Sequence, residues 1–186
     1  YTAISVLMNI ATLIVLRDKP DLLDERAKPG VGAQKWDKAI LGIGLLLTIA
    51  TQIVAGLDTG RYHWSPEYSW TWVLLGAALN ILGMIIFLYA MRENKFFSPV
   101  ARIQEDRKHT VCTTGPYRFV RLPGYIGMII GTMGFPFLFL SVWSCIPVAL
   151  SVVNLIVRTA LEDRFLESQL KGYRDYKQTT RFRLIP

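Results

Sequence analysis

The stretch from Leu122 to Val157 contains no Lys, Arg, Asp or Glu, and it limits the possible folds of this chain more than any other feature. A helix that crosses a hydrocarbon core of about 30 Å needs about 20 residues. The stretch is too long for one such helix, but it suits two helices that fold back on each other. Gly134, Pro136 and Ser141 weaken a continuous helix near its middle. We therefore expect a helical hairpin in a membrane, with its turn between residues 134 and 144.

Other uncharged runs approach the length of a membrane-spanning helix. The chain is therefore predicted to be an all-α integral membrane protein with five transmembrane helices, the last two forming the hairpin. The first run begins without a basic leader, so we interpret it as a membrane span and not as a signal peptide. The five expected helices cover residues 1–16, 39–57, 68–91, 124–140 and 142–161 of a single membrane-embedded domain, 1–186.

Charged residues gather in the connections between these runs. Hydrophobic residues make up 52% of the chain and charged residues 19%, which excludes a disordered or collagen-like chain. In chain order, the connections and the tail contain six, one, seven, none and seven Lys and Arg residues. By the positive-inside rule, this alternation places the N-terminus outside and the C-terminus in the cytosol. It also accounts for the net charge of +7 without nucleic acid as a partner.

Small residues recur at helical spacing in two of the expected spans. Such a face lets another helix approach closely. We expect the last span to pack against the small-residue face of the first hairpin helix. The small residues are Gly124, Gly127, Gly131 and Gly134 in the hairpin, and Gly76, Asn80 and Gly83 in the span over 68–91.

Two cytosolic segments, 92–123 and 161–186, are long enough to carry function. Ser98 followed by Pro99 predicts a helix cap and a short helix as far as Asp106. The last helix is expected to run through Leu170 and to stop at Gly172. We expect the two segments to close over each other at the membrane surface.

The sequence lacks several familiar kinds of site. Cys112 and Cys145 are expected on opposite sides of the membrane, as are His63 and His109, so neither pair predicts a disulfide or a metal site. There is no Walker loop and no dinucleotide-binding glycine motif that joins a strand to a helix. Gly42-Ile43-Gly44 lies inside an expected membrane span, where we expect it to serve packing. We expect no metal cofactor.

Asn154, Arg158 and Glu162 recur at every fourth position of the last expected span and form a polar stripe on an apolar helix. In one interpretation, Arg158 and Glu162 form a surface ion pair near the membrane boundary. In the other, Arg158 binds an anionic group, because its planar guanidinium suits a carboxylate or a phosphate. Ionisable residues at this depth are functional candidates. The residues themselves leave both interpretations open.

The run GPYRFVRLPGYIG over 115–127 resembles a motif of the isoprenylcysteine carboxyl methyltransferase family, in its short prokaryotic form. In that family, the motif precedes a hairpin of two spans, an acidic pair and a tyrosine-containing tail. Here Glu162 and Asp163 follow the hairpin, and Gly172-Tyr173 and Tyr176 lie in the tail. The resemblance covers about residues 94–186.

That family consists of integral membrane enzymes that bind S-adenosylmethionine without a Rossmann domain and methylate the carboxylate of a C-terminal isoprenylated cysteine. The resemblance implies the same activity here, with S-adenosylhomocysteine as the product, membrane lipids as the surroundings and no obligate protein partner. Arg158 matches the position that the family assigns to the substrate. The residues that the resemblance places around the cofactor are Gln104, His109, Thr110, Val111, Cys112, Tyr117, Leu122, Pro123, Gly124, Tyr125 and Glu162.

The expected chemistry is simple. A carboxylate is ionised at neutral pH, so its methylation by a sulfonium needs no general base. Arg158 is the expected catalytic residue, holding the acceptor carboxylate while apolar surroundings remove its water. Glu162, one turn closer to the cytosol, is expected to bind the ammonium group or the ribose hydroxyls of the cofactor.

Three other functions stay open. A phospholipid-amine methyltransferase would use the same cofactor on another acceptor, and a sterol-reductase-like enzyme would use NADPH. The third is a membrane scaffold without activity. Leu122 favours the scaffold, because the resembling family has histidine at this position. Leucine suffices there if the position contributes only its backbone and an apolar wall.

Overall fold

The computed structural model describes residues 2–19, 22, 25 and 32–185. Helices dominate this part of the chain, which contains no β-strand. Short turns of other helical types cover Asp58–Tyr62, Glu105–Arg107 and Gly115–Arg118. The α-helices are α1 (Thr2–Leu16), α3 (Lys35–Leu57), α4 (Trp70–Glu93), α5 (Pro123–Met133), α6 (Phe135–Phe139), α7 (Cys145–Gln169) and α8 (Tyr173–Thr179).

Three helical segments within the described residues are long and apolar enough to cross a membrane: Lys35–Tyr62, Trp70–Glu93 and Cys145–Gln169. The shorter apolar segment Pro123–Phe139, formed by α5 and α6, runs beside them. Large apolar side chains on these helices are exposed; Leu74, for example, is 70% exposed. Apolar exposure of this extent suits hydrocarbon as the surrounding medium. The protein is an integral membrane protein.

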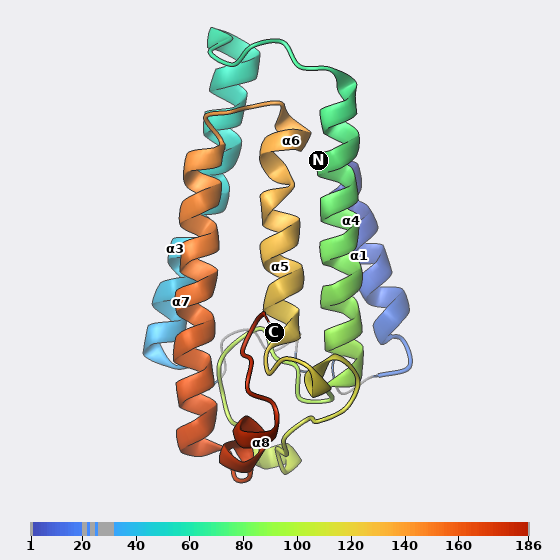
Figure 1. Ribbon diagram of the computed structural model, residues 1–186, viewed down its shortest axis with the longest axis vertical. Coiled ribbons are helices and arrows are strands. Elements are labelled where there is room, and N and C mark those ends of the chain that lie inside the picture. The colour runs from blue at the N-terminus through green and yellow to red at the C-terminus, as the bar shows by residue number, and fades with distance from the viewer. Residues whose placement is uncertain (1, 20–21, 23–24, 26–31, 186) are drawn as a thin grey trace.

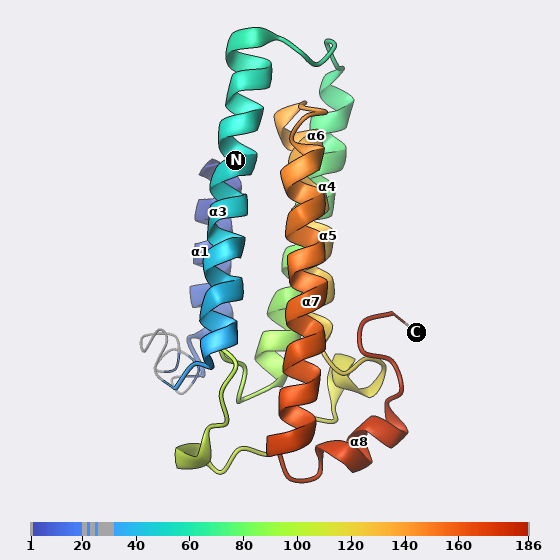
Figure 2. The ribbon, with the colours of Figure 1, turned by 90° about the vertical axis from the view of Figure 1, so that its left-hand side faces the viewer.

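The long helices form a bundle with two different ends (Figures 1 and 2). In Figure 1, α5 lies between α7 and α4, with α3 beside α7 and α1 beside α4. The connection after α4 and the segment after α7 lie at one end, called the tail end below. The connection from α3 to α4 and the turn before α7 lie at the opposite end.

The closest helix contact joins α4 to α5 through glycines. A Cβ atom at Gly83 would lie 2.5 Å from the carbonyl oxygen of Gly127, and one at Gly127 would lie 2.5 Å from that of Gly83. A Cβ atom at Gly76 would lie 2.8 Å from the carbonyl oxygen of Gly134. The two predicted small-residue stripes therefore pack against each other. Our expectation that the last span covers the α5 stripe was wrong, because spacing defines a face but not its partner.

A buried carboxylate connects two loops at the opposite end. Asp58 accepts hydrogen bonds from the Ser65 backbone at 2.7 Å and from the hydroxyls of Ser65 and Ser141 at 2.6 and 2.5 Å. The Ser65 hydroxyl in turn accepts a hydrogen bond from the Val142 backbone at 2.9 Å. This Asp58 cluster holds the turn before α7 against the end of α3.

The predicted helix from Pro99 to Asp106 was wrong. This stretch is irregular as far as Gln104 and contains only the short turn Glu105–Arg107. The Ala101 backbone N–H donates to Asp37 Oδ2 at 2.7 Å, and the Ala101 carbonyl accepts from the Gln34 backbone at 3.3 Å. Contacts with the start of α3 therefore outweigh the local cap signal. In the tail, Leu170 caps α7 and Gly172 takes a φ of +84°. The last long helix therefore ends where the sequence indicated, and the chain turns into α8.

Candidate functional site

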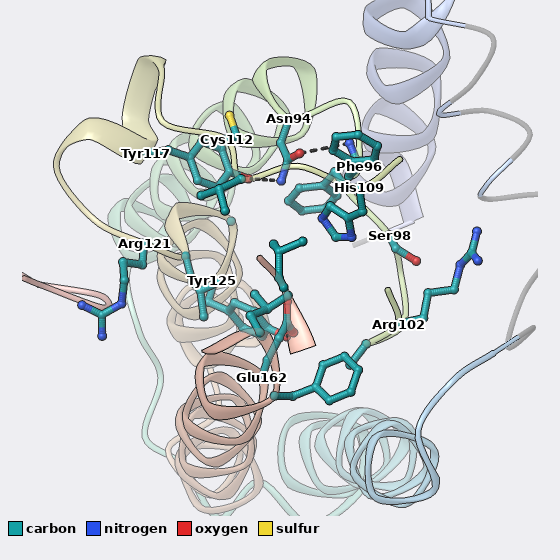
Figure 3. A pocket seen from close by; sticks show the side chains of 18 of the residues that line it. Asn94, Phe96, Ser98, Arg102, His109, Cys112, Tyr117, Arg121, Tyr125 and Glu162 are labelled. Atoms are coloured by element: carbon teal, nitrogen blue, oxygen red, sulfur yellow. Dashed lines mark hydrogen bonds between the residues drawn. The ribbon is translucent and has the colours of Figure 1, made fainter. Parts of the chain in front are cut away.

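The tail end of the bundle contains a cavity of about 290 Å³. Its walls come from α3, α4, the connection after α4, α5, α7 and α8, which are far apart in the sequence. Figure 3 shows Tyr125 and Glu162 together on one wall, with Phe96 and His109 across from them. Cavities of this size and mixed polarity are typical of small-molecule sites.

The structure brings ten of the twelve predicted site residues to this cavity. Gln104 and Pro123 do not line it. Gln104 is fully buried, donates to the Phe96 carbonyl at 2.8 Å and accepts from Arg107 at 2.8 Å, so it shapes the connection behind the wall. The ten that line the cavity are His109, Thr110, Val111, Cys112, Tyr117, Leu122, Gly124, Tyr125, Arg158 and Glu162.

Arg158 forms a buried ion pair with Asp37 of α3. Its Nε donates to Asp37 Oδ1 at 2.8 Å, and its Nη2 lies 3.4 Å from Oδ2. Nη2 also donates to the Pro99 carbonyl at 2.8 Å. Nη1 has no acceptor among the residues that the structure describes, and it is not a buried atom. The guanidinium is therefore fixed on one side and open to a ligand on the other.

Tyr125 and Glu162 form the second polar contact of the cavity. The Tyr125 hydroxyl donates to Glu162 Oε2, and the Arg158 guanidinium carbon lies 5.6 Å from the centre of the Tyr125 ring. The predicted surface ion pair between Arg158 and Glu162 is not among the ion pairs of the described residues. Each residue has a separate partner, and both line the cavity.

The opposite wall contains an uncharged histidine. The centroids of the His109 and Phe96 rings lie 4.5 Å apart, and His109 Nδ1 accepts a hydrogen bond from the Gln104 backbone N–H at 3.4 Å. Burial, with the nearby charges of Arg102 and Arg107, lowers the pKa of His109 to about 4. Since Nδ1 accepts, Nε2 carries the proton of the neutral ring.

Three buried tyrosines close the cavity towards the tail. Tyr176 donates to the Tyr117 carbonyl at 2.6 Å, and Tyr117 donates to the Ala90 carbonyl at 3.3 Å. Tyr173 donates to Asp163 at 2.8 Å. Burial raises the pKa of all three hydroxyls above the ordinary value, so they remain neutral donors.

A second arginine–aspartate pair fastens the tail. Arg121 donates to both oxygens of Asp163, at 2.7 and 2.9 Å. Its Nη1 donates to the carbonyls of Thr180 and Arg181, at 2.9 and 2.6 Å. In Figure 3 the Arg121 side chain points away from Tyr125 and Glu162. This residue holds the closing segment in place, and each of its three guanidinium nitrogens has an acceptor within the protein.

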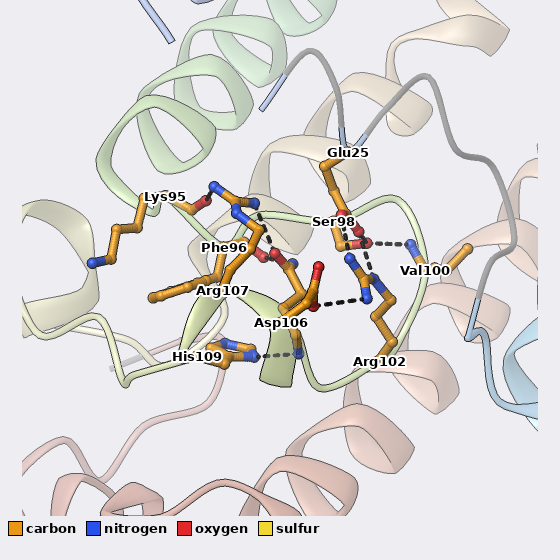
Figure 4. Close-up of polar contacts among 10 residues, drawn as sticks. Glu25, Lys95, Phe96, Ser98, Val100, Arg102, Asp106, Arg107 and His109 are labelled. Carbon is orange, nitrogen blue, oxygen red and sulfur yellow. Dashed lines mark hydrogen bonds and ion pairs between the residues drawn. The ribbon is translucent and has the colours of Figure 1, made fainter. Parts of the chain in front are cut away.

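A third pair braces the outer side of the connection (Figure 4). Arg102 donates to Glu25 through Nε at 2.8 Å and through Nη2 at 2.5 Å, and Ser98 donates to the same carboxylate at 2.8 Å. The Arg102 guanidinium holds the pKa of Glu25 below its ordinary value. Arg107 donates to the Lys95 carbonyl at 3.0 Å in the same network.

A second cavity, of about 240 Å³, lies deeper in the bundle between α3, α5, α6 and α7. Leu41, Met128 and Arg158 line both cavities, so the two meet at the arginine. Apolar side chains such as Leu45, Phe135 and Phe139 form much of its wall. Within the described ranges, no cluster of His, Cys, Asp and Glu could hold a metal ion.

Comparison with known proteins identifies the family. The family model described as phospholipid methyltransferase matches residues 71–172, from the start of α4 to the end of α7. The chain belongs to the phospholipid methyltransferase family. The matched region of the family supplies most of the first cavity, whereas α1 and α3 lie outside the match.

Two rice proteins, from Oryza sativa subsp. indica and subsp. japonica, are named "Probable protein-S-isoprenylcysteine O-methyltransferase" and are each 28% identical to the chain over 123 residues. The match covers 61% of this chain and 62% of each relative, so the chain spans about three fifths of their length. Within the phospholipid methyltransferase family, these comparisons support the resemblance that the motif over 115–127 indicated.

The fold resembles that of a solved structure, the eukaryotic intramembrane Ras methyltransferase, an isoprenylcysteine carboxyl methyltransferase. The TM-score is 0.58 at 19% identity, over 73% of this chain and 50% of that chain. The family member described here thus shares this helical arrangement over about half the length of the solved protein.

Leu122 is the residue at which the chain departs from the motif. Its side chain is 8% exposed and lines the first cavity, and its backbone N–H donates to the Arg183 carbonyl at 3.2 Å. The position thus contributes an apolar wall and a backbone contact to the tail. These are contributions that leucine makes as well as histidine.

Of the four residues in the Arg158–Asp37 and Arg121–Asp163 pairs, sequence reasoning identified only Arg158 as a site residue. Asp37 lies 121 residues before Arg158 and in a region without motif signature. Arg121 lies inside the recognised motif, and Asp163 follows Glu162 directly. The sequence indicated the Arg121–Asp163 pair only in that both residues lie in segments that resemble the family. Nothing in the sequence indicated Asp37.

Proposed function

We propose that the chain is an S-adenosylmethionine-dependent methyltransferase that acts on the carboxylate of an isoprenylated C-terminal cysteine, or of a related lipid-linked acceptor. The observation that carries the proposal is the position of Arg158. It lies where the cavity at the tail end meets the deeper apolar cavity, with Nη1 available for an anion. A substrate with a carboxylate and a lipid tail fits both features at once.

The residues of the first cavity fit the proposed cofactor. S-adenosylmethionine supplies a methyl carbon on a positively charged sulfur. Glu162 offers a carboxylate for an ammonium group or for ribose hydroxyls, and the rings of Phe96 and Tyr125 suit a cationic sulfur. His109 is neutral at physiological pH, so it does not repel a positive charge.

Arg158 would hold the acceptor. Its Nη1 binds a carboxylate oxygen while Asp37 and the Pro99 carbonyl hold the other side of the guanidinium. The carboxylate is already ionised, so the site needs no general base, and no proton moves in the transfer. The chain contributes orientation and exclusion of water, which are the main sources of rate for such a step.

The deeper cavity suits the lipid part of the acceptor. It lies within the helical bundle, between helices of membrane-spanning length and composition, and its wall is largely apolar. Because Leu41 and Met128 line both cavities, a tail in the deeper one places its polar end next to Arg158. The proposed enzyme has five transmembrane helices, and its cofactor cavity faces the cytosol, as the distribution of Lys and Arg favours.

A phospholipid amine is the second candidate acceptor, because the matching family model is described as phospholipid methyltransferase. The charge at the junction disfavours it. A protonated amine would meet the guanidinium of Arg158 there, while the carboxylate of Asp37 is fully buried behind it.

The first experiment is calorimetric titration of S-adenosylhomocysteine into the detergent-purified protein, with NADPH as the control ligand. Saturable binding of S-adenosylhomocysteine alone supports the methyltransferase. Binding of NADPH alone supports the sterol-reductase-like enzyme, and binding of neither by a folded protein supports the scaffold.

The second experiment identifies the acceptor. Transfer of a radioactive methyl group is measured with N-acetyl-farnesylcysteine, with its carboxamide as a matched control, and with phosphatidylethanolamine. We expect base-labile product from the carboxylic acid alone. Transfer to phosphatidylethanolamine and not to the acid would replace the proposed acceptor by the amine.

A further inference from the structure

We propose that Asp37 is a positioning residue that fixes the orientation of Arg158 towards the acceptor carboxylate. This inference rests on the proposed function, and it concerns a helix that the family match does not include. Asp37 lies in the first turn of α3, and its side chain is fully buried. It does not line either cavity, so it acts only through other residues.

The Asp37 carboxylate is itself held from two directions. Its backbone belongs to α3, and its Oδ2 accepts from the Ala101 N–H at 2.7 Å. The other contacts are those to Arg158 Nε and Nη2, at 2.8 and 3.4 Å. The carboxylate therefore links three segments: α3, the connection after α4, and α7.

Arg158 is fixed as a consequence. Nε and Nη2 are bound by Asp37, and Nη2 is also bound by the Pro99 carbonyl at 2.8 Å. Because the guanidinium is planar, fixing Nε and Nη2 also fixes the direction of Nη1. Nη1 is the remaining donor group, and the structure leaves it open where the cavities meet. Correct orientation of a reacting group can account for large parts of a rate.

Charge gives this inference a distinctive kinetic signature. Asp37 and Arg158 together are neutral, so the acceptor carboxylate meets a directed N–H group but little net charge. An uncharged residue at position 37 leaves the arginine more positive but less well oriented. The KM for the acceptor should then stay the same or fall, while kcat falls.

The test compares Asp37→Asn with Asp58→Asn. Both aspartates are fully buried, both lie in the helical segment Lys35–Tyr62, and both accept hydrogen bonds from other parts of the chain. Asp58 belongs to the cluster at the opposite end and contacts neither cavity. For each variant we measure S-adenosylhomocysteine affinity, thermal unfolding, and kcat and KM per S-adenosylhomocysteine-binding site.

We expect Asp37→Asn to lower kcat per binding site by about 100-fold, without a rise in the acceptor KM. Asp58→Asn should keep kcat within about threefold and lose thermal stability to a similar degree. A kcat within threefold of wild type in Asp37→Asn would overturn the inference. So would equal kcat losses in the two variants, since these would indicate a general loss of structure.

The arginine Nε–H signal of Arg158 in nitrogen-15 NMR spectra separates this inference from the proposed function. It is assigned by its loss in Arg158→Lys. If the wild type methylates no acceptor, the proposed function fails, and the inference then depends on this signal alone. Slow solvent exchange that Asp37→Asn abolishes supports it, and an unchanged signal in that variant overturns it.

Discussion

The two buried arginine–aspartate pairs of this protein look alike but differ in what they leave free. Arg158 pairs with Asp37 and Arg121 with Asp163; each arginine is 6% exposed, and both line the first cavity. Every nitrogen of Arg121 has an acceptor, since Nη1 binds two carbonyls of the tail. Nη1 of Arg158 has none among the described residues.

The difference separates a structural arginine from a ligand-binding one. A buried pair in which every guanidinium nitrogen has an acceptor holds segments together, and its removal affects folding. A pair with one open donor can bind an anion without losing its internal partner. The residue types and the burial of the arginines are the same in both pairs, so the two roles are distinguished by whether a guanidinium nitrogen is left without an acceptor.

The largest expected effect follows from replacing each arginine by lysine. Arg158→Lys should lower kcat/KM by about 1,000-fold, because lysine cannot bind Asp37 in a bidentate manner and also present a directed donor. Arg121→Lys should lower it by less than about fivefold per folded molecule, because this arginine is fully used by the fold. Methyl transfer is measured per S-adenosylhomocysteine-binding site. Equal losses in the two variants would remove the distinction between the pairs.

Lysine is preferred to alanine at position 158. Arg158→Ala should also abolish turnover and leave cofactor affinity nearly intact, but it leaves the fully buried Asp37 without a counter-charge. A loss of folding in that variant would hide the effect on the reaction. Lysine retains a positive charge next to the carboxylate.

The second prediction concerns stability. Arg121→Leu should cost about 3–5 kcal/mol of the free energy of unfolding, because it leaves the buried Asp163 with the Tyr173 hydroxyl at 2.8 Å and only the more distant Lys177, at 4.0 Å, as a counter-charge. Arg121→Leu combined with Asp163→Leu should recover more than half of this loss, since no charge is then left unpaired. Reversible unfolding in mixed micelles measures both. A double variant less stable than the single one would show that the tail needs the ion pair itself.

The sequence predicted Arg158 and Glu162 because local helical spacing brings them to one face of one helix. The motif over 115–127 added most of the remaining cavity residues, since these lie close together in the chain. Uncharged length indicated the hairpin in the same way. Each of these predictions depends on information within one or two helical turns, or within a single uninterrupted run.

The missed features depend on contacts between distant segments. Asp37 pairs with a residue 121 positions away, and no local pattern records such a contact. The same aspartate binds the Ala101 backbone and keeps the segment after Ser98 out of the predicted helix. The glycine face of α5 was correctly identified, but its partner α4 could be known only from the packed bundle.

Glu162 provides a third, smaller effect. Glu162→Gln should weaken S-adenosylhomocysteine binding by about 10-fold, because it removes the charge proposed to bind the ammonium group. Tyr125→Phe should weaken it less, since Tyr125 only donates to Glu162. Calorimetry measures both affinities. Unchanged binding in Glu162→Gln would leave Glu162 without a role in cofactor binding.

The last expected effect is a pH dependence that comes from neither pair. The pKa of His109 is lowered to about 4 in the folded protein, against 6.5 ordinarily, so the unfolded chain binds a proton first as the pH falls. The free energy of unfolding should therefore be highest above pH 6.5 and fall between pH 6.5 and pH 4, by about 2 kcal/mol, which allows for the partial exposure of the ring.

His109→Phe should remove this slope, because phenylalanine retains the stacking on Phe96 without a titratable ring. Unfolding of the wild type and of His109→Phe is compared at pH 7.5 and pH 5. A slope that persists in the variant would assign the titration to another group. The two arginine–aspartate pairs are therefore best compared above pH 7, where His109 is neutral in both the folded and the unfolded chain and its protonation adds no difference in stability.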